Sequence, residues 1–192
     1  MKSWFFRYYS LTLINLVFII VLAIGQEVDV PVNTQVPIFF KILAFDRNLQ
    51  TKAKDEINIG IVYQGKFNLS RDIKDSFVSE LDNLVDNKIQ ELPVKYFPID
   101  LDLQNLETAI KNKKINIIYV TPLRAFDIKK ITTLSRQYQV CTLTGISEYV
   151  EKGIAVGIDV KGDRPEILIN LQAAKSENSD FSSQLLKLAH IY

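Results

Sequence analysis

Apolar residues along this chain gather in short uninterrupted runs that are separated by longer stretches with helical spacing. Four of these runs have the length and composition of buried strands: Ile57–Tyr63, Val94–Ile99, Ile115–Val120 and Val140–Leu143. They do not alternate between apolar and polar residues, which is typical of strands covered on both faces. Because helical stretches lie between them, we predict a parallel sheet built from right-handed βαβ units.

The helical stretches themselves are amphipathic. Residues 71–88 form the clearest example, because six apolar positions share one helical face. An opening helix is predicted over Thr34–Phe45, where the apolar residues follow the spacing i, i+3, i+4 and i+7. Two more helices are expected around Leu106 and around Ile131. Each of these helices needs a surface to cover, and the predicted sheet offers two faces.

The C-terminal part of the chain has a different pattern. Residues 154–160 alternate between apolar and small or polar side chains, which predicts a strand with one buried face. A turn over residues 161–165 leads to a second strand, Glu166–Asn170, so this hairpin should place an antiparallel edge on the sheet. A closing helix is predicted around Phe181, Leu185, Leu188 and Ala189. The predicted fold class is α/β, with three layers: a mostly parallel sheet flanked by helices, a C-terminal antiparallel hairpin and a closing helix.

The N-terminus has the pattern of a secretory signal peptide. Lys2 and Arg7 precede an apolar run over residues 11–24, and Ala23-Ile24-Gly25 fits a signal-peptidase site before Gln26. The run is shorter than the roughly 20 residues that cross a bilayer. A cleaved signal is therefore the first interpretation, and an uncleaved inner-membrane signal anchor is the alternative.

This pattern sets the expected domain organisation. We expect residues 1–25 to be the signal peptide and residues 26–192 to form a single α/β domain, because no repeat, low-complexity linker or shift in composition divides them. The mature protein should then be periplasmic.

Composition and charge narrow the classes of function. The 192 residues include 23 Lys and Arg against 22 Asp and Glu, and no basic tract suggests binding to nucleic acid. The single cysteine, Cys141, excludes an intrachain disulfide and a zinc site built from cysteines. The single histidine, His190, makes a polyhistidine metal site and a Ser-His-Asp triad improbable. We therefore expect no metal, no cofactor and no catalytic residues.

The loops that follow the parallel strands are the strongest general candidates for binding. In open α/β sheets, ligands bind beyond the carboxyl ends of the strands. The candidate ligand or partner loops are therefore Tyr63, Gln64, Gly65, Thr121, Pro122, Thr144 and Gly145.

Three other motifs favour structural roles. Gly60–Lys66 begins like a phosphate-binding loop, but Phe67 stands where that motif needs Ser or Thr. Asp100 and Asp102 could hold a hard cation, yet no further acidic cluster lies nearby and Asp102 is well placed to cap the next helix. Cys141 lies within an apolar strand, so we expect it to be buried and unreactive.

Two stretches carry a family pattern. In Ile167–Ala189, a strand ending in Ile-Asn-Leu leads to small residues and a Leu-Leu-Lys-Leu-Ala segment, and Gln35 stands before Lys41-Ile-Leu in the opening helix. Both stretches resemble the YfiR-like family of exported bacterial proteins, and with the order of elements the resemblance extends over residues 34–192. The signature residues are Gln35, Lys41, Asn170, Ala173, Ala174, Leu185, Leu186 and Leu188.

These signature residues also have a structural interpretation. Small side chains at Ala173 and Ala174 allow a helix to approach the sheet closely, and Asn170 can tie a strand end to a turn through its amide. The leucines of the closing segment would fill the core.

The resemblance implies regulation by contact. The best understood members of the family are periplasmic repressors of an inner-membrane diguanylate cyclase, and related domains are fused to sensor kinases. By resemblance, this chain would be a non-enzymatic protein that binds the extracytoplasmic domain of a membrane diguanylate cyclase or histidine kinase, with effects on cyclic-di-GMP and biofilm formation. Whether the protein forms a homodimer is left open by the sequence. Some members use paired cysteines for redox control, which a single Cys141 does not allow within one chain. The alternative function is a periplasmic small-molecule binding protein.

Overall fold

The structure is a computed structural model that describes residues 28 and 30–192. The predicted signal peptide lies outside the described residues, so cleavage or anchoring of the N-terminus stays a prediction. In the described range, every helix is too short or too polar to cross a bilayer.

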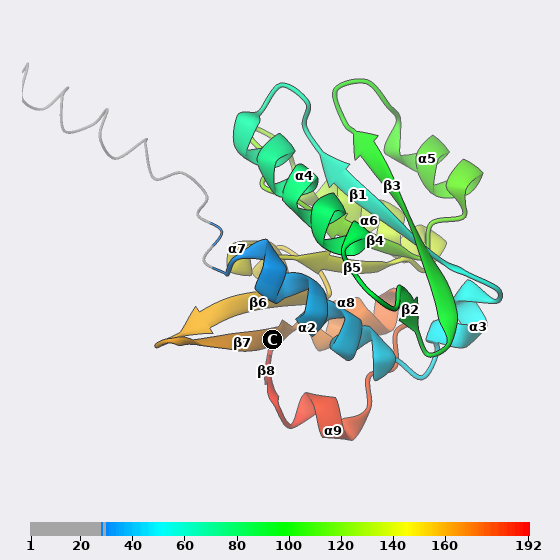
Figure 1. The fold of residues 1–192 in the computed structure, drawn as a ribbon, viewed down its shortest axis with the longest axis vertical. Helices are drawn as coiled ribbons and strands as arrows, with labels where there is room; N and C mark the ends of the chain where they lie inside the picture. The colour runs from blue at the N-terminus through cyan, green and yellow to red at the C-terminus, as the bar shows by residue number, and fades with distance from the viewer. Residues whose placement is uncertain (1–27, 29) are drawn as a thin grey trace, which may run out of the picture.

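The described residues form one eight-stranded sheet in the order β2-β3-β1-β4-β5-β6-β7-β8 (Figure 1). Its strands are β1 (Ile57–Tyr63), β2 (Lys88–Ile89), β3 (Leu92–Asp100), β4 (Ile117–Val120), β5 (Cys141–Thr144), β6 (Val156–Lys161), β7 (Arg164–Ile169) and β8 (Ala189–Ile191). The five strands from β3 to β6 in this order pair in parallel, and β6 and β7 form an antiparallel hairpin. The predicted mostly parallel sheet with a C-terminal hairpin is confirmed.

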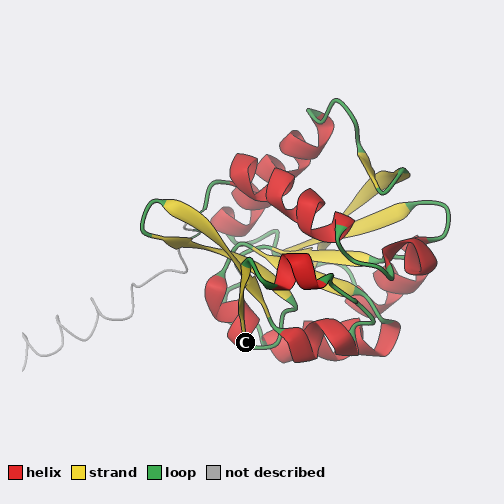
Figure 2. Ribbon diagram, turned by 90° about the horizontal axis from the view of Figure 1, so that it is seen from below, coloured by secondary structure: helices red, strands yellow, loops and turns green. Residues whose placement is uncertain are grey.

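Helices cover both faces of the sheet (Figure 2). They are α2 (Val32–Ala44), α3 (Leu49–Ala53), α4 (Asn68–Asp82), α5 (Leu106–Lys113), α6 (Ile128–Tyr138), α7 (Ser147–Glu151), α8 (Leu171–Ser176) and α9 (Ser183–Leu186). Successive strand residues point to opposite faces. In β1, Ile61 packs into the core beneath α2 and α4, whereas Val62 packs into the core beneath α5, α6 and α7. Both faces of the central strands are therefore buried, which explains their uninterrupted apolar sequences.

The helix predicted over residues 71–88 begins and ends earlier, at Asn68 and Asp82. The chain leaves the helix to form β2, an unpredicted strand of two residues that pairs with the start of β3. Asn87 stabilises this turn, because its backbone oxygen accepts from Val94 N at 2.9 Å and its amide donates to Val94 O at 3.1 Å. Val85, which the helical spacing placed on the buried face, is instead fully exposed.

The closing helix is present but shorter than predicted. Only α9 is helical, with Ser182 as its cap, and the chain then forms β8 parallel to β7. The hydrogen bond from Tyr192 N to Ile169 O, 2.9 Å long, continues this pairing. The edge of the sheet is therefore β8 and not the hairpin, and Ala189 lies in a strand.

Candidate functional site

The loops after β1, β4 and β5 lie next to one another at the carboxyl edge of the sheet, as the topology predicted. The Gln64 side chain bridges two of them, because its Nε2 donates to Arg124 O at 3.2 Å and its Oε1 accepts from Arg124 N at 2.6 Å. Thr121 Oγ1 lies 2.7 Å from Ser70 Oγ at the start of α4. Thr144 Oγ1 donates to the Val120 carbonyl at 3.0 Å. The candidate loops thus form one polar edge.

Side chains of the protein itself close much of this edge. Gln35 of α2 is fully buried, donates from Nε2 to Val30 O at 2.7 Å and accepts at Oε1 from Tyr119 Oη at 2.9 Å. A Cβ at Gly145 would lie only 2.4 Å from Gln35 Nε2, so the absence of a side chain at Gly145 makes room for this amide. Four of the seven candidate residues are buried: Thr121, Pro122, Thr144 and Gly145. Tyr63, Gln64 and Gly65 are partly exposed.

The two carboxylates at the end of β3, Asp100 and Asp102, accept hydrogen bonds from backbone amides. Asp100 Oδ1 accepts from Gly65 N at 2.9 Å, and Asp102 Oδ2 accepts from Lys66 N at 2.8 Å. The prediction that Asp102 caps the next helix is wrong, because Asn105 caps α5 by accepting from Thr108 N at 3.0 Å. These carboxylates hold the turn after β1 against the end of β3. Among the described residues, no group of three or more His, Cys, Asp or Glu side chains could hold a metal ion.

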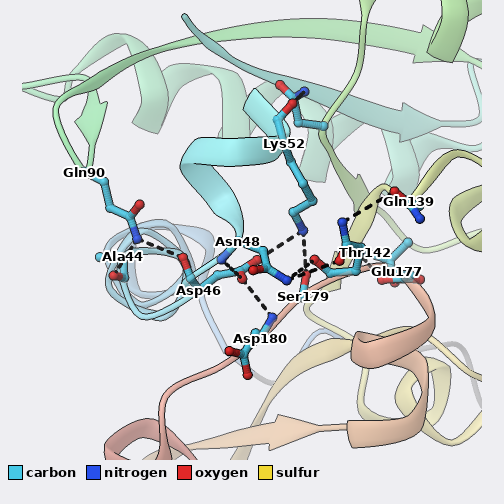
Figure 3. A network of polar contacts seen from close by, with 12 residues as sticks. Ala44, Asp46, Asn48, Lys52, Gln90, Gln139, Thr142, Glu177, Ser179 and Asp180 are labelled. Carbon is cyan, nitrogen blue, oxygen red and sulfur yellow. Dashed lines mark hydrogen bonds and ion pairs between the residues drawn. The ribbon is translucent and has the colours of Figure 1, made fainter. Parts of the chain in front are cut away.

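A second polar cluster lies at the opposite, amino end of the central strands, where Asp46, Lys52, Thr142, Glu177 and Ser179 meet (Figure 3). We refer to these five residues as the polar junction. Lys52 Nζ lies 3.1 Å from Asp46 Oδ2, with both side chains almost completely shielded from solvent, and donates to Ser179 Oγ at 2.8 Å. The two buried charges therefore form an ion pair, which is the one interaction of Asp46 Oδ2 in the described structure, because the hydrogen bonds of this carboxylate go to Oδ1.

Glu177 is the second carboxylate of the polar junction and has no exposed surface. Its Oε1 accepts from Ser135 Oγ at 2.6 Å and from Thr142 Oγ1 at 2.8 Å, and its Oε2 accepts from Thr142 N at 2.8 Å. Burial raises the pKa of Glu177 to about 7, although these hydrogen bonds and the charge of Lys52 oppose the shift. This carboxyl group therefore titrates close to neutral pH.

The polar junction joins segments that are far apart in the sequence. Asp46 Oδ1 accepts from Asn48 N at 3.0 Å and from Asp180 N at 2.9 Å. Gln90 Nε2 donates to Asp46 O at 3.0 Å, and this hydrogen bond connects the β2–β3 hairpin to the polar junction. The end of α2, the hairpin and the segment after α8 are held together at one point. Cys141 is buried beside it, and burial raises its pKa to about 12.

The signature residues occupy several environments. Asn170 caps α8 by accepting from Ala173 N at 2.9 Å and donates to Val150 O at 3.0 Å. Ala173, Ala174 and Leu185 are buried, Leu186 is half-buried, and Lys41 is exposed. The expectation that all the leucines fill the core is wrong for Leu188, which is 70% exposed because it lies in the turn between α9 and β8.

Sequence reasoning did not find the polar junction. Its residues come from α3, β5 and the two connecting segments after α2 and α8, and none of them forms a motif with its neighbours in sequence. Gln35 is a signature residue and Gly145 is a candidate loop residue, and nothing in the sequence connects the two. Their contact bridges 110 positions and depends on the tertiary fold.

The mostly parallel sheet with helices on both faces places this protein among the three-layer α/β domains. The profile of the YfiR/HmsC-like family matches residues 37–190. Because this match covers most of the chain, the chain belongs to the YfiR/HmsC-like family, and the resemblance noted in the sequence is confirmed. No curated protein matches the sequence significantly.

Solved structures share the fold. A conserved domain protein from Vibrio cholerae O1 biovar El Tor aligns with a TM-score of 0.55 at 12% identity, over 85% of this chain and 60% of that one. The ligand-free, open structure of CD0873, a substrate binding protein with adhesive properties from Clostridium difficile, aligns with a TM-score of 0.52 at 16% identity, over 76% of this chain and 57% of that one. The chain thus spans about 60% of the length of these structures. At such identities the likeness concerns the fold.

Proposed function

We propose that this protein is an exported regulator that controls a membrane-bound diguanylate cyclase or sensor kinase by binding its extracytoplasmic domain. Membership of the YfiR/HmsC-like family, a regulatory family, over residues 37–190 is the observation that carries the proposal. In this proposal residues 1–25 direct export, and residues 26–192 act in the periplasm as one domain. An uncleaved anchor would leave the domain in the same compartment.

The polar side chains at the carboxyl edge of the sheet suit this role because several of them are engaged in holding the fold. Asp100 and Asp102 accept hydrogen bonds from the backbone, and the amide of Gln35 is bonded at both ends. The Cys141 thiol is buried with a pKa of about 12, so very little of it is thiolate at neutral pH. We therefore propose that the protein acts by contact and catalyses no reaction.

A regulator that acts by contact needs exposed apolar surface. In the described chain, six large apolar side chains are exposed, and three of them lie between residues 188 and 192: Leu188, Ile191 and Tyr192. They surround β8, whose outer side has no neighbouring strand in the described part of the sheet. An edge strand with apolar side chains is a favourable place for another protein to bind. We propose that the membrane sensor contacts this edge.

The test is site-specific photo-crosslinking in the cells that make the protein. A photoreactive residue replaces Leu188 in one full-length variant and Leu103 in another. Leu103 is the matched control, because it is 81% exposed and follows β3 near the other end of the sheet. We expect a membrane sensor with an extracytoplasmic domain to crosslink from position 188 and not from position 103.

The functional readout is the output of the captured sensor. For a cyclase, cellular cyclic-di-GMP should rise when the gene for this chain is deleted and should fall again when the gene is restored. For a kinase, autophosphorylation should change in the same comparison. Capture of no integral membrane sensor, or an unchanged output after deletion, would overturn the proposal.

A second candidate function, binding of a small molecule, is favoured by one observation. An open recess of about 380 Å³ lies between α6, α7 and α8, away from the carboxyl edge of the sheet. The two functions are compatible, because a bound molecule could be the signal to which a regulator responds.

A further inference from the structure

The recess has three walls, one from each helix. Its volume of about 380 Å³ lies in the range of small-molecule sites. It is lined by Lys129, Thr132, Thr133 and Arg136 from α6, by Glu151, Lys152 and Gly153 from the end of α7 and the turn after it, and by Asn170, Gln172 and Ala173 from the start of α8.

The charge of the recess is positive. Three cations line it, Lys129, Arg136 and Lys152, against one carboxylate, Glu151. Lys152 lies 3.4 Å from the carboxylate of Glu148, so part of its charge is already paired. The described residues offer no carboxylate within 4 Å of Arg136 or of Lys129. Two cations therefore face the recess without a direct ion pair to a carboxylate of the described chain, and Glu151 is the one carboxylate in the lining.

Gly153 brings the guanidinium of Arg136 close to the backbone of the turn after α7. A Cβ built at Gly153 would lie 2.9 Å from Arg136 Nη2, and Gly153 also has a φ of +103°, which side chains rarely allow. The guanidinium thus occupies the place that a side chain would take. Its hydrogen-bond donors have no protein partner in the described structure, so they are available to a ligand.

A simpler interpretation of Arg136 is its position in the last turn of α6, where a cation favours the helix dipole. That interpretation explains a positive residue at this position. It explains neither the recess, nor the second unpaired cation at Lys129, nor the close approach to Gly153. A planar guanidinium with free donors matches the two oxygens of a carboxylate or phosphoryl group.

We propose that this recess binds a small organic anion through a carboxylate or phosphoryl group. Arg136 makes the bidentate contact, and Lys129 and Lys152 flank it. Thr133, whose side chain is exposed at the recess, supplies a hydroxyl group for orientation. The proposal rests on the second candidate function, small-molecule binding at this recess, and names the chemical class of the ligand. It does not depend on the proposed contact between β8 and a membrane sensor.

The test uses the protein as the cell exports it, purified and titrated with inorganic phosphate or with citrate at constant ionic strength. Binding is followed by isothermal titration calorimetry. We expect saturable binding of at least one of the two anions, weakened at least tenfold in Arg136→Gln and less in Arg136→Lys. Phosphate alone binding would identify a phosphoryl ligand, and citrate alone a carboxylate ligand.

The matched control is Arg124→Gln, which removes the same charge from an exposed arginine outside the recess. Circular dichroism and thermal unfolding show whether each variant remains folded. Equal weakening by Arg124→Gln and Arg136→Gln would mean general electrostatic attraction and would overturn the proposal. So would the lack of saturable binding of both anions to the folded wild-type protein.

Discussion

The strongest prediction concerns the pH dependence of stability through Glu177. Burial raises its pKa from the ordinary 4.5 to about 7, so the folded protein holds a proton between these pH values that the unfolded chain releases. The contribution of Glu177 to the free energy of unfolding is therefore highest below about pH 4.5 and is lost as the pH rises through 7. At 1.36 kcal/mol for each pKa unit, the total loss is about 3 kcal/mol.

The substitution Glu177→Gln removes this titration while keeping the shape of the side chain. The amide oxygen can accept from Thr142 N, and the amide nitrogen can donate to Ser135 Oγ, which can turn its own proton to Thr132 O at 3.0 Å. The variant should therefore fold. Its free energy of unfolding should lack the decrease with rising pH that Glu177 causes in the wild type.

The assay is urea unfolding of both proteins at pH 5 and pH 8. The stability of Glu177→Gln relative to wild type should increase by about 2–3 kcal/mol between these pH values, because most of the titration lies between them. Comparing the two proteins cancels the titration of all other groups. Glu148→Gln is the control, since Glu148 lies on the surface and its relative stability should change by less than about 0.5 kcal/mol. A pH-independent difference for Glu177→Gln would refute the reasoning.

Three further predictions concern packing and paired charges. Lys52→Met should cost about 3–5 kcal/mol in urea unfolding, because it leaves the Asp46 carboxylate buried without its partner; a cost below about 1 kcal/mol would mean that the pair is hydrated. Gly145→Ala should lower stability by about 1–3 kcal/mol, because its Cβ would collide with Gln35. Adding Gln35→Ala should then cost less than it does in the wild type, and additive effects would argue against this contact. Asn170→Ala should cost about 1 kcal/mol through loss of the α8 cap, measured as a lower melting temperature, whereas an unchanged value would exclude that role.

The parallel part of the fold could be predicted because its signal is local. A strand such as β4, Ile117–Val120, is buried on both faces and is apolar at every position. Its flanking helices carry apolar residues at helical spacing, and the handedness rule then leaves few topologies. The neighbouring positions of the candidate loops followed from that topology.

The C-terminal segment shows why local spacing was insufficient. The apolar positions Phe181, Leu185 and Leu188 fit one helical face. Phe181 instead forms a β-bridge with Asp46, and the chain from Ala189 onward pairs with β7. Tertiary pairing therefore decided the conformation of residues whose own spacing favoured a helix.

The candidate sites depend on contacts that no local pattern records. Nothing near Glu177 in the sequence distinguishes it from an exposed glutamate, because its burial comes from Thr142 and Ser135 on other elements. The closure of the carboxyl edge likewise depends on where α2 lies. The recess forms only when α6, α7 and α8 pack side by side, and Arg136 and Lys129 then face the same space.

The contact between Asp46 and a distant part of the sequence has a consequence for the rate of folding. Its carboxylate is hydrogen-bonded to the backbone of Asp180, 134 residues further along the chain, so this contact cannot form until nearly all the intervening elements have come together. Contacts between such distant segments slow folding, because a long loop must be closed before any of them is gained. We therefore expect the contact between Asp46 and the backbone of Asp180 to form late during refolding, and its loss to accelerate unfolding more than it slows folding.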